Sequence, residues 1–343
     1  MKGSEHNDEP FLYAMKTVGL TYDLKTDYQF KAGDPPDANA EFDVPSTIDV
    51  IAQAIESCGY AVKRIGNATS LLEQIDRLDV DIVFNISEGT SGRNRESQVP
   101  ILLEMYNIPF VGADALTLGL ALDKIMAKKV FIAEGIPTPN FFEIKSLEQL
   151  TNSDHLQFPL IVKPRFEGSS KGLSDNSRVY SMEELRRQVG LVVTAYKQPA
   201  LVEEFISGQE FTVAVVGNDP PQVLPLVQIQ IDGKLQLGDE FYTFARISSD
   251  RLEYVCPAPI EPKLYQRISD LALKVYNSVE CRDFGRIDFR VDKGGEPFAL
   301  EINPLPSLST EDVFMLIAKV QGMTYPQMIN EILTSALKRY NLS

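Results

Sequence analysis

Apolar residues follow two different periods along the first 112 residues of the chain. Four short apolar runs have the length of buried strands, at residues 15–21, 61–65, 81–86 and 108–112. Stretches with helical spacing lie between them, at residues 46–59, 70–78 and 96–106. Strands that alternate with helices predict a parallel α/β sheet in this part of the chain.

The first of these helices has a signal at each end. Ser46-Thr47-Ile48-Asp49 matches a capping box, which predicts that the helix begins there. Gly59 is expected to end it. Its apolar residues recur at helical spacing and predict one buried stripe, made by Ile48, Ile51, Ala52 and Ile55.

The pattern is looser over residues 113–206 and predicts a small α+β unit. We expect one long helix over residues 116–134 and strands over 158–163 and 200–205. A short polar loop lies at residues 167–172, and Ser181-Met182-Glu183-Glu184 matches a second capping box.

Strand patterns dominate after residue 207. They occupy residues 210–216, 223–231, 285–291 and 298–303, with helices expected at 262–279, 311–320 and 325–340. We therefore predict three units, with bounds at residues 1–112, 113–206 and 207–343.

Composition narrows the function. The 343 residues include 33 Lys plus Arg and 48 Asp plus Glu, a net charge of −15, so we expect no nucleic-acid partner. No uncharged apolar run reaches the ~18 residues of a membrane span, and the N-terminal residues lack an apolar signal segment. Three scattered cysteines fit a reduced, cytoplasmic protein. The chain has two histidines, and this small number argues against a Ser-His-Asp triad and against a histidine-rich zinc site.

Residues 286–303 predict a β-hairpin that carries chemistry. Gly294-Gly295 between two alternating runs predicts a two-residue turn. The register that follows pairs apolar residues on one face, with Ile287 opposite Ile302, Phe289 opposite Leu300 and Val291 opposite Phe298.

The other face of this hairpin is polar. Asp288 falls opposite Glu301, and Arg286 falls opposite Asn303. Two adjacent carboxylates repel each other and need a cation between them. Carboxylate and amide oxygens without His or Cys suit a hard ion such as Mg²⁺. The alternative is a solvated face on which Arg286 pairs with an acid.

A nucleotide is the second ligand that the polar residues suggest. Lys163 ends an apolar strand and needs an anionic partner there. The loop Glu167-Gly168-Ser169-Ser170-Lys171-Gly172 offers amides, hydroxyls and an ammonium group to phosphate oxygens. A plain surface turn is the alternative. Neither the P-loop motif nor the Rossmann glycine motif occurs.

Seven short motifs follow one another along the chain. They are Asp123-Lys124, Ile161-Val162-Lys163-Pro164, Glu167-Gly168-Ser169-Ser170, Leu201-Val202-Glu203-Glu204-Phe205-Ile206, Gly208-x-Glu210-Phe211-Thr212-Val213, Gly285-Arg286-Ile287-Asp288 and Glu301-Ile302-Asn303. This ordered set resembles the ATP-grasp superfamily, and most closely the D-alanine–D-alanine ligase family. The resemblance covers the chain from about residue 80 to its end.

This resemblance implies an ATP-grasp fold behind an N-terminal parallel α/β domain. Residues 1–112 would be the substrate domain, 113–206 the small subdomain with the lid and phosphate loop, and 207–343 the subdomain with the metal site. It also implies ATP as a substrate and Mg²⁺, or alternatively Mn²⁺, as the metal. Small amino acids would be the substrates that bind as partners, and a homodimer would fit the family, which is often dimeric.

The same resemblance implies a role for each matching residue. The nucleotide would contact Lys124, Lys163, Gly168, Ser169, Ser170, Lys171, Glu203, Glu204, Ile206 and Glu210. Within this set Lys124, Lys163 and the 168–172 loop face the phosphates, Glu203, Glu204 and Ile206 the adenine, and Glu210 the ribose. Asp288, Glu301 and Asn303 would bind the metal. Arg286, Ser170 and Glu88 would form the catalytic set.

The implied reaction is ATP-dependent amide formation between a carboxylate and an amine, through an acyl phosphate. Two alternatives stay open: an ATP-grasp ligase with another amine acceptor in a biosynthetic or peptide-tailoring pathway, and a nucleotide-binding module without turnover.

The chain departs from the family pattern around its substrates. The family's Gly-Gly-x-Ser-x-Glu segment is absent, and Glu88 stands where the family has a histidine. Ser307 replaces a glycine, and Asp312 falls near a serine that binds the second substrate's carboxylate. We therefore hypothesise that the second substrate carries a positive charge or lacks that carboxylate. The alternative is that both acids face solvent. Arg93-Asn94-Arg95 would contact the first substrate's carboxylate or cap the following helix.

Overall fold

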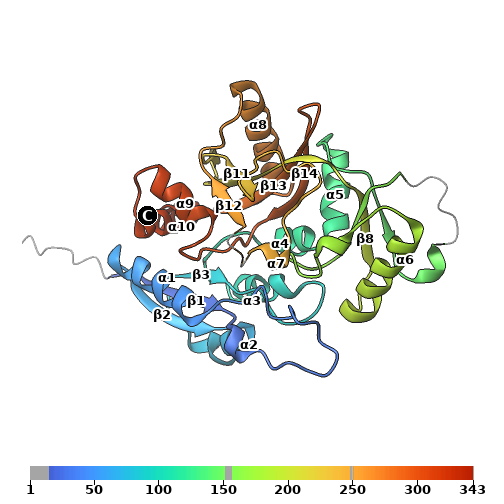
Figure 1. The fold of residues 1–343 in the computed structure, drawn as a ribbon. Coiled ribbons are helices and arrows are strands. Elements are labelled where there is room, and N and C mark those ends of the chain that lie inside the picture. Colours follow the sequence, from blue (N-terminus) through green and yellow to red (C-terminus); the bar gives the residue numbers. More distant parts are fainter. Residues whose placement is uncertain (1–14, 151–156, 248, 250, 343) are drawn as a thin grey trace, which may run out of the picture.

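The computed structural model describes residues 15–150, 157–247, 249 and 251–342, and it divides them among three sheets (Figure 1). The polar N-terminal segment and both histidines lie outside these residues. Each of the three predicted units holds one sheet, while the exact domain bounds stay predictions. No helix among the described residues is long and apolar enough to cross a membrane.

The N-terminal sheet is parallel, as predicted, with strand order β2-β1-β3-β4. Its strands are β1 (Thr17–Tyr22), β2 (Ala61–Gly66), β3 (Ile82–Ile86) and β4 (Phe110–Val111). Its helices are α1 (Pro45–Ser57), α2 (Ala68–Gln74) and α3 (Gln98–Met105), with short 3₁₀ turns at Lys25–Asp27, Ile75–Arg77 and Arg95–Ser97.

Helix α1 buries the predicted stripe, but its predicted capping box is wrong. The helix begins one residue earlier, at Pro45, and the apolar side chain of the N-cap residue Val44 cannot accept a hydrogen bond. Proline tolerates the first helical position because its missing N–H has no partner there in any helix.

The middle sheet is antiparallel, with order β5-β8-β6-β7. Its strands are β5 (Phe141–Ile144), β6 (Leu160–Pro164), β7 (Arg178–Val179) and β8 (Ala200–Glu204). The segments that connect these strands contain α6 (Met182–Leu191), a π-helical turn at Val192–Tyr196, and 3₁₀ turns at Leu147–Gln149 and Asp175–Ser177. Ser181 caps α6 as predicted, yet the Glu184 carboxylate accepts from the N–H of Tyr180 rather than of Ser181.

The predicted long helix over residues 116–134 is wrong, because the chain breaks at Asp123. Two helices result, α4 (Ala115–Leu122) and α5 (Lys124–Ala133). Asp123 caps α5 by accepting from the N–H of Met126, and it also accepts hydrogen bonds from Arg93 and Arg165. The break places Lys124 at the first turn of α5.

The large sheet is antiparallel, with order β12-β11-β9-β13-β14 and β10 beside β9. Its strands are β9 (Gly208–Val216), β10 (Gln222–Val223), β11 (Val227–Ile231), β12 (Leu252–Val255), β13 (Phe284–Asp292) and β14 (Pro297–Asn303). The helices of this part are α7 (Phe244–Ile247), α8 (Pro262–Ser278), α9 (Val313–Val320) and α10 (Tyr325–Arg339). The single strand predicted at 223–231 is split into β10 and β11.

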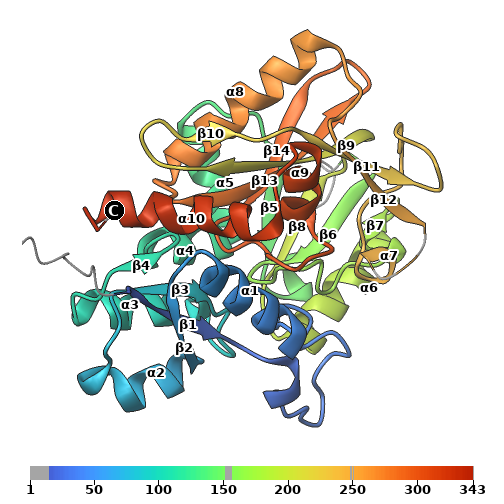
Figure 2. The ribbon, with the colours of Figure 1, turned by 90° about the vertical axis from the view of Figure 1, so that its left-hand side faces the viewer.

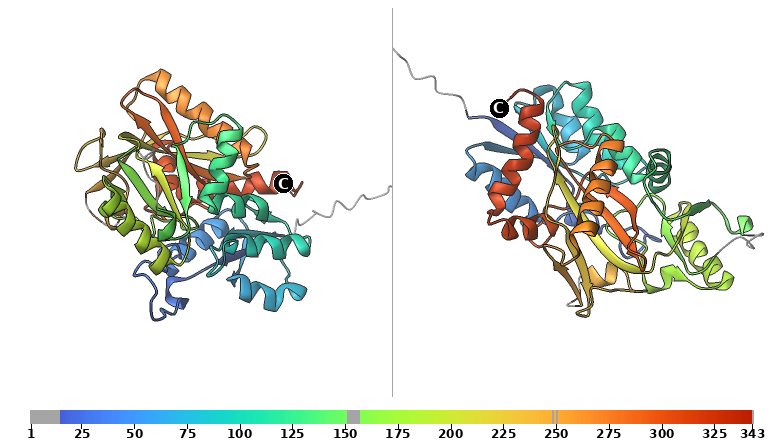
Figure 3. Two further views of the ribbon diagram at one scale, coloured as in Figure 1. Left: turned by 90° about the vertical axis from the view of Figure 1, so that its right-hand side faces the viewer. Right: turned by 90° about the horizontal axis from the view of Figure 1, so that it is seen from above.

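Strand β9 shows how this sheet joins the three units. Val213 and Val215 pack in the same core as α8, whereas Ala214 and Val216 pack in the core that also contains α1 and α10. Alternate residues therefore bury opposite faces of the sheet. Helix α10 lies between the large sheet and the N-terminal unit (Figure 2), and α8 covers the outer face (Figure 3).

The β13–β14 hairpin is correct at its open end and wrong near its turn. Arg286 pairs with Asn303, Ile287 with Ile302 and Asp288 with Glu301, as predicted. Beyond Asp288 a bulge shifts the register, so that Phe289 pairs with Ala299 and Val291 with Pro297.

The turn explains this shift. It spans Lys293–Glu296 rather than two residues, and the Asp292 carboxylate accepts from the N–H groups of Gly294 and Glu296, both at 2.8 Å. One extra residue on β14 must then go unpaired. Leu300 accordingly leaves the apolar face and lines the cavity described below.

Candidate active site

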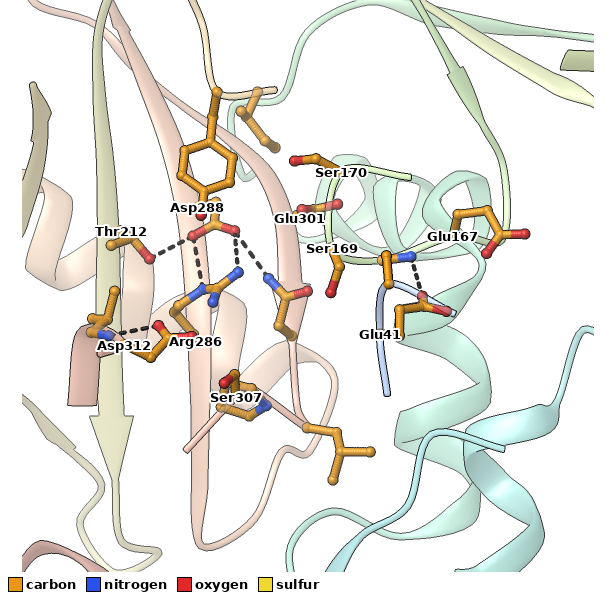
Figure 4. Close-up of a pocket in the computed structure, with 18 of the residues that line it drawn as sticks. Glu41, Glu167, Ser169, Ser170, Thr212, Arg286, Asp288, Glu301, Ser307 and Asp312 are labelled. Carbon is orange, nitrogen blue, oxygen red and sulfur yellow. Dashed lines mark hydrogen bonds and ion pairs between the residues drawn. The ribbon is translucent and has the colours of Figure 1, made fainter. Parts of the chain in front are cut away.

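A cavity of about 870 Å³ lies where the three sheets meet. All of the site residues predicted from the sequence line it except Lys171, which the same loop holds beside it. The wall also includes residues 39–44, which precede α1, and residues 304–313, which follow β14 (Figure 4). No motif or period in the sequence predicted the contribution of residues 39–44.

The polar face of the hairpin forms one wall. The Asp288 carboxylate accepts from Arg286 Nε at 3.2 Å, from Thr212 Oγ1 at 2.6 Å and from Asn303 Nδ2 at 3.0 Å (Figure 4). Glu301 forms an ion pair with Lys124. The repulsion between the two carboxylates is thus offset by a guanidinium group on one side and an ammonium group on the other.

These contacts keep Glu301 ionised. Burial raises the pKa of Glu301, but Lys124 and Lys163 outweigh it and lower that pKa to about 2. For Arg286, burial lowers the pKa while Asp288 and Asp312 raise it well above its usual value.

The donor set fits a hard divalent cation. Asp288 and Glu301 supply carboxylate oxygens from adjacent strands, and Asn303 keeps its amide oxygen free because its Nδ2 is the atom that donates to Asp288. Oxygen ligands on a preformed, largely buried face are what Mg²⁺ or Mn²⁺ prefers.

A buried ion chain holds Lys163. Both oxygens of Glu203 are paired, one with Lys163 Nζ at 2.7 Å and one with Lys128 Nζ at 2.5 Å, and Glu203 is fully buried. Burial raises the pKa of Glu203, but the two lysines lower it below its usual value. Lys128, which the sequence reasoning missed, is therefore part of the support of the site.

The end of the cavity near β8 combines apolar rings with a buried arginine. Phe205 and Phe241 pack with Ile161 in a small apolar cluster. Arg290, also missed, donates to the carbonyl of Ile206 at 2.6 Å and to Glu210 Oε2 at 2.8 Å.

Glu204 is the outermost member of this predicted hinge. It accepts a hydrogen bond from Asn140 Nδ2 at 2.9 Å. Of the predicted adenine and ribose contacts, the main-chain groups of Glu204 and Ile206 and the Glu210 carboxylate all stand at this end of the cavity.

Acids from the N-terminal unit hold the predicted phosphate loop. The Glu41 carboxylate accepts from the N–H of Gly168 at 2.5 Å and from Lys171 Nζ at 3.0 Å, and Asp37 accepts from the N–H of Gly172 at 2.8 Å. These are the donors that we expected to meet phosphate oxygens. The hydroxyls of the two loop serines, Ser169 and Ser170, make no hydrogen bond to another described residue, and both residues have positive φ angles.

Glu88 belongs to a group of three carboxylates on the N-terminal side. Oxygens of Glu41, Glu88 and Glu96 lie within 4.8 Å of one another. Burial, and then Glu96 and Glu41, raise the pKa of Glu88 well above its usual value, and burial raises the pKa of Glu96 to about 7. The alternative that Glu88 and Asp312 are exposed to solvent is wrong, because both are partly buried in the cavity wall.

The reading of Arg93-Asn94-Arg95 as a cap is wrong, because Asn94 precedes the 3₁₀ turn Arg95–Ser97 without a side-chain capping hydrogen bond, while contact with a substrate carboxylate stays a prediction. Arg95 is buried and donates to Glu41 at 2.6 Å and to the carbonyl of Phe166 at 2.7 Å, so it joins the N-terminal unit to the loop. Arg93 pairs with Asp123 at 2.7 Å.

Comparison with known proteins agrees with this geometry. A family model described as the C-terminal domain of D-ala D-ala ligase matches residues 130–334. The D-alanine–D-alanine ligase of Carboxydothermus hydrogenoformans is 34% identical over 85% of this chain and 93% of that protein, and the uncharacterised protein y4sG of Sinorhizobium fredii is 36% identical over 85% and 88%.

Solved structures of the same kind share the fold. The D-alanine–D-alanine ligase of Bacillus anthracis complexed with ATP superposes with a TM-score of 0.72 at 20% identity, covering 95% of this chain and 99% of that one. VanG D-Ala:D-Ser ligase of Enterococcus faecalis gives 0.70 at 20% identity, with 94% and 99% covered. The fold is thus the ATP-grasp fold of a ligase. The chain belongs to the D-alanine–D-alanine ligase family.

Proposed function

We propose that the protein is a cytoplasmic ATP-dependent ligase that joins the carboxylate of a small amino acid to an amine. The observation that carries this proposal is the hairpin face, where Asp288, Glu301 and Asn303 stand beside Arg286 and Lys124 in one cavity. Two carboxylates held between two cations suit a reaction in which several anions must meet. A homodimer stays a prediction.

ATP fits the cavity along its length. The apolar rings of Phe205 and Phe241 suit the adenine, and Glu210 suits the ribose hydroxyls. Lys124, Lys163 and the 168–172 loop would neutralise the phosphates. Here Glu41 occupies the amide and ammonium groups of that loop, so we expect phosphate binding to displace its carboxylate.

Asp288, Glu301 and Asn303 would hold Mg²⁺, with Mn²⁺ as the alternative ion. When bound, the ion supplies positive charge against phosphate oxygens. Lys124 then becomes free to turn from Glu301 to a phosphate.

The proposed chemistry has two balanced steps. A carboxylate oxygen of the donor forms a bond to the γ-phosphorus, the bond from that phosphorus to the β–γ bridging oxygen breaks, and ADP leaves. The amine nitrogen then attacks the carbonyl carbon, the bond to the phosphate oxygen breaks, phosphate leaves, and a proton passes to solvent. Arg286 would orient the reacting carboxylate, with the Ser170 hydroxyl and Glu88 beside the reactants.

Two alternatives compete with an amino-acid ligase. A ligase with another type of acceptor would use the same phosphate and metal residues and differ only at the acceptor end. A nucleotide-binding module without turnover has no need of the paired metal face and Arg286. The completeness of that face therefore favours an enzyme.

Hydroxylamine provides the test because it traps an acyl phosphate from any donor. Wild-type protein with ATP and Mg²⁺ should form ADP and a hydroxamate with at least one amino acid of a panel of both stereochemistries. Asp288→Asn should lower this rate about 100-fold or more, since it removes one metal ligand and a partner of Arg286. Asp270→Asn, an exposed acid on α8, is the matched control and should keep the wild-type rate. Nucleotide binding without ADP formation would instead indicate the module.

A further inference from the structure

One part of the cavity wall is acidic, and we call it the acceptor end. It is bounded by Asp43 from before α1, Tyr242, Tyr254 and Asp312. In Figure 4, Asp312 and Glu301 lie on opposite sides of Arg286. Because nucleotide and metal would fill the Glu301 side, the amine substrate must approach from the Asp312 side.

Asp312 occupies the first amide of helix α9. It is the N-cap residue of α9, and its Oδ1 accepts from the N–H of Val313 at 2.6 Å. The first amide of a helix normally attracts anions. Here a protein carboxylate already holds that amide, so an incoming carboxylate would meet a negative charge instead of a donor.

The charge of Asp312 is offset only in part. Arg286 attracts it electrostatically, but no cation among the described residues forms an ion pair with Asp312. Arg286 donates twice to Asp288, at 3.2 and 3.1 Å. The other cationic side chains among the described lining residues pair elsewhere or are exposed: Lys124 with Glu301, Lys163 with Glu203, Arg290 with Glu210, and Lys25 exposed to solvent.

Asp43 is a second acid of this wall. Its side chain accepts no hydrogen bond from a described residue. Burial raises the pKa of Asp43 to about 7, and Asp23 and Asp312 add to the rise against the opposing effect of Lys25. Asp43 and Asp312 therefore lie close enough to repel each other, and a cation at the acceptor end would relieve this repulsion.

We propose that the acceptor end binds an amine that carries a second cationic group in place of a carboxylate, and that Asp312 is the residue that selects it. This inference rests on the proposed ligase function. The free amine attacks the carbonyl carbon of the acyl phosphate, phosphate leaves and one proton goes to solvent. The second group stays protonated between Asp43 and Asp312 and takes no part in bond making.

Three amines that each have three carbon atoms separate the effect of charge from that of size: 1,3-diaminopropane, propylamine and β-alanine. A donor that gives hydroxamate is first found with hydroxylamine, and kcat/KM is then measured for each acceptor. We expect 1,3-diaminopropane to exceed propylamine about tenfold and β-alanine about 100-fold, as for unit charges in a partly buried site.

Asp312→Asn tests the residue without disturbing the helix, because Asn caps a helix as well as Asp does. It should reduce the spread among the three acceptors to about threefold or less. This spread is a ratio within one variant, so it does not depend on the overall rate of that variant. Asp114→Asn is the matched control: Asp114 caps α4 by accepting from the N–H of Thr117 at 3.0 Å, outside the cavity. That variant should keep the full spread.

The outcomes separate the two proposals. Absence of hydroxamate with every donor would overturn the ligase function. Hydroxamate formation with a preference for β-alanine over 1,3-diaminopropane would overturn the acceptor assignment alone. An unchanged spread in Asp312→Asn would show that Asp312 does not select the acceptor.

Discussion

Glu203→Gln should destabilise the protein strongly, because Glu203 is the only ion-pair partner of both Lys128 and Lys163 among the described residues. The three groups are almost completely buried, with side-chain exposures of 0% for Glu203, 1% for Lys128 and 12% for Lys163. Removing one partner of a buried ion pair leaves charge without compensation and costs about 3–5 kcal/mol. We expect a loss of unfolding free energy in this range at pH 7.

The pH dependence has a defined sign. Burial already lowers the pKa of Lys128 below its usual value, and loss of Glu203 lowers it further. Between the folded and unfolded pKa values, the unfolded chain then binds more protons than the folded one. Stability therefore rises with pH in this window. The defect of Glu203→Gln should be smaller at pH 9.5 than at pH 7.

Urea unfolding followed by far-ultraviolet circular dichroism measures this effect, since the chain has no tryptophan. The double variant Glu203→Gln with Lys128→Met should recover part of the loss, because one of the two unpaired ammonium groups is gone. A loss below about 1 kcal/mol, or one that grows with pH, would refute the assigned role of Glu203.

Three further predictions concern other parts of the structure. Gly208→Ala should lower the free energy of unfolding in urea by more than about 3 kcal/mol, because an added Cβ would lie 1.9 Å from the carbonyl oxygen of Val291. The control Gly233→Ala, where the Cβ would enter open space at φ +75°, should lower it by only about 1 kcal/mol. Asp43→Asn should raise the free energy of unfolding by about 1–2 kcal/mol at pH 8 and change it little at pH 4. Because the pKa of Asp43 is raised to about 7 in the folded chain, the folded wild type binds more protons than the unfolded chain below that pH. The wild type therefore loses stability at this group as the pH rises toward 7. Glu41→Gln should speed proteolysis and amide exchange in the 168–172 loop severalfold, since it weakens the bonds to Gly168 and Lys171.

The sequence predicted the metal face more accurately than the hairpin that carries it. The pairing of Asp288 with Glu301 follows from alternation alone and is confirmed. The bulge at Leu300 does not, because it depends on how the Asp292 side chain builds a four-residue turn. The predicted residue pairs remain correct where the bulge lies between them and the turn.

Contacts between distant loops were beyond sequence reasoning. Glu41 and Asp37 sit in an acidic segment that reads as solvated loop, yet they bind the Gly168–Gly172 loop more than 120 residues away. No local period or motif encodes such a contact. It depends on how α1 and the N-terminal sheet pack against the other units, which individual propensities do not specify.

The paired charges of the cavity also predict that metal and nucleotide bind together. Glu301 is held by Lys124, so Mg²⁺ alone must compete with an ammonium group for this carboxylate, whereas a phosphate offers Lys124 another partner. We therefore expect Mg²⁺ to bind at least about tenfold more tightly with a non-hydrolysable ATP analogue than without it, and by linkage the analogue to gain equally from Mg²⁺. Lys124→Met should raise the affinity for Mg²⁺ alone and reduce this coupling. Isothermal titration calorimetry measures both quantities, and equal Mg²⁺ affinity in Lys124→Met and wild type would show that Lys124 does not guard the metal face.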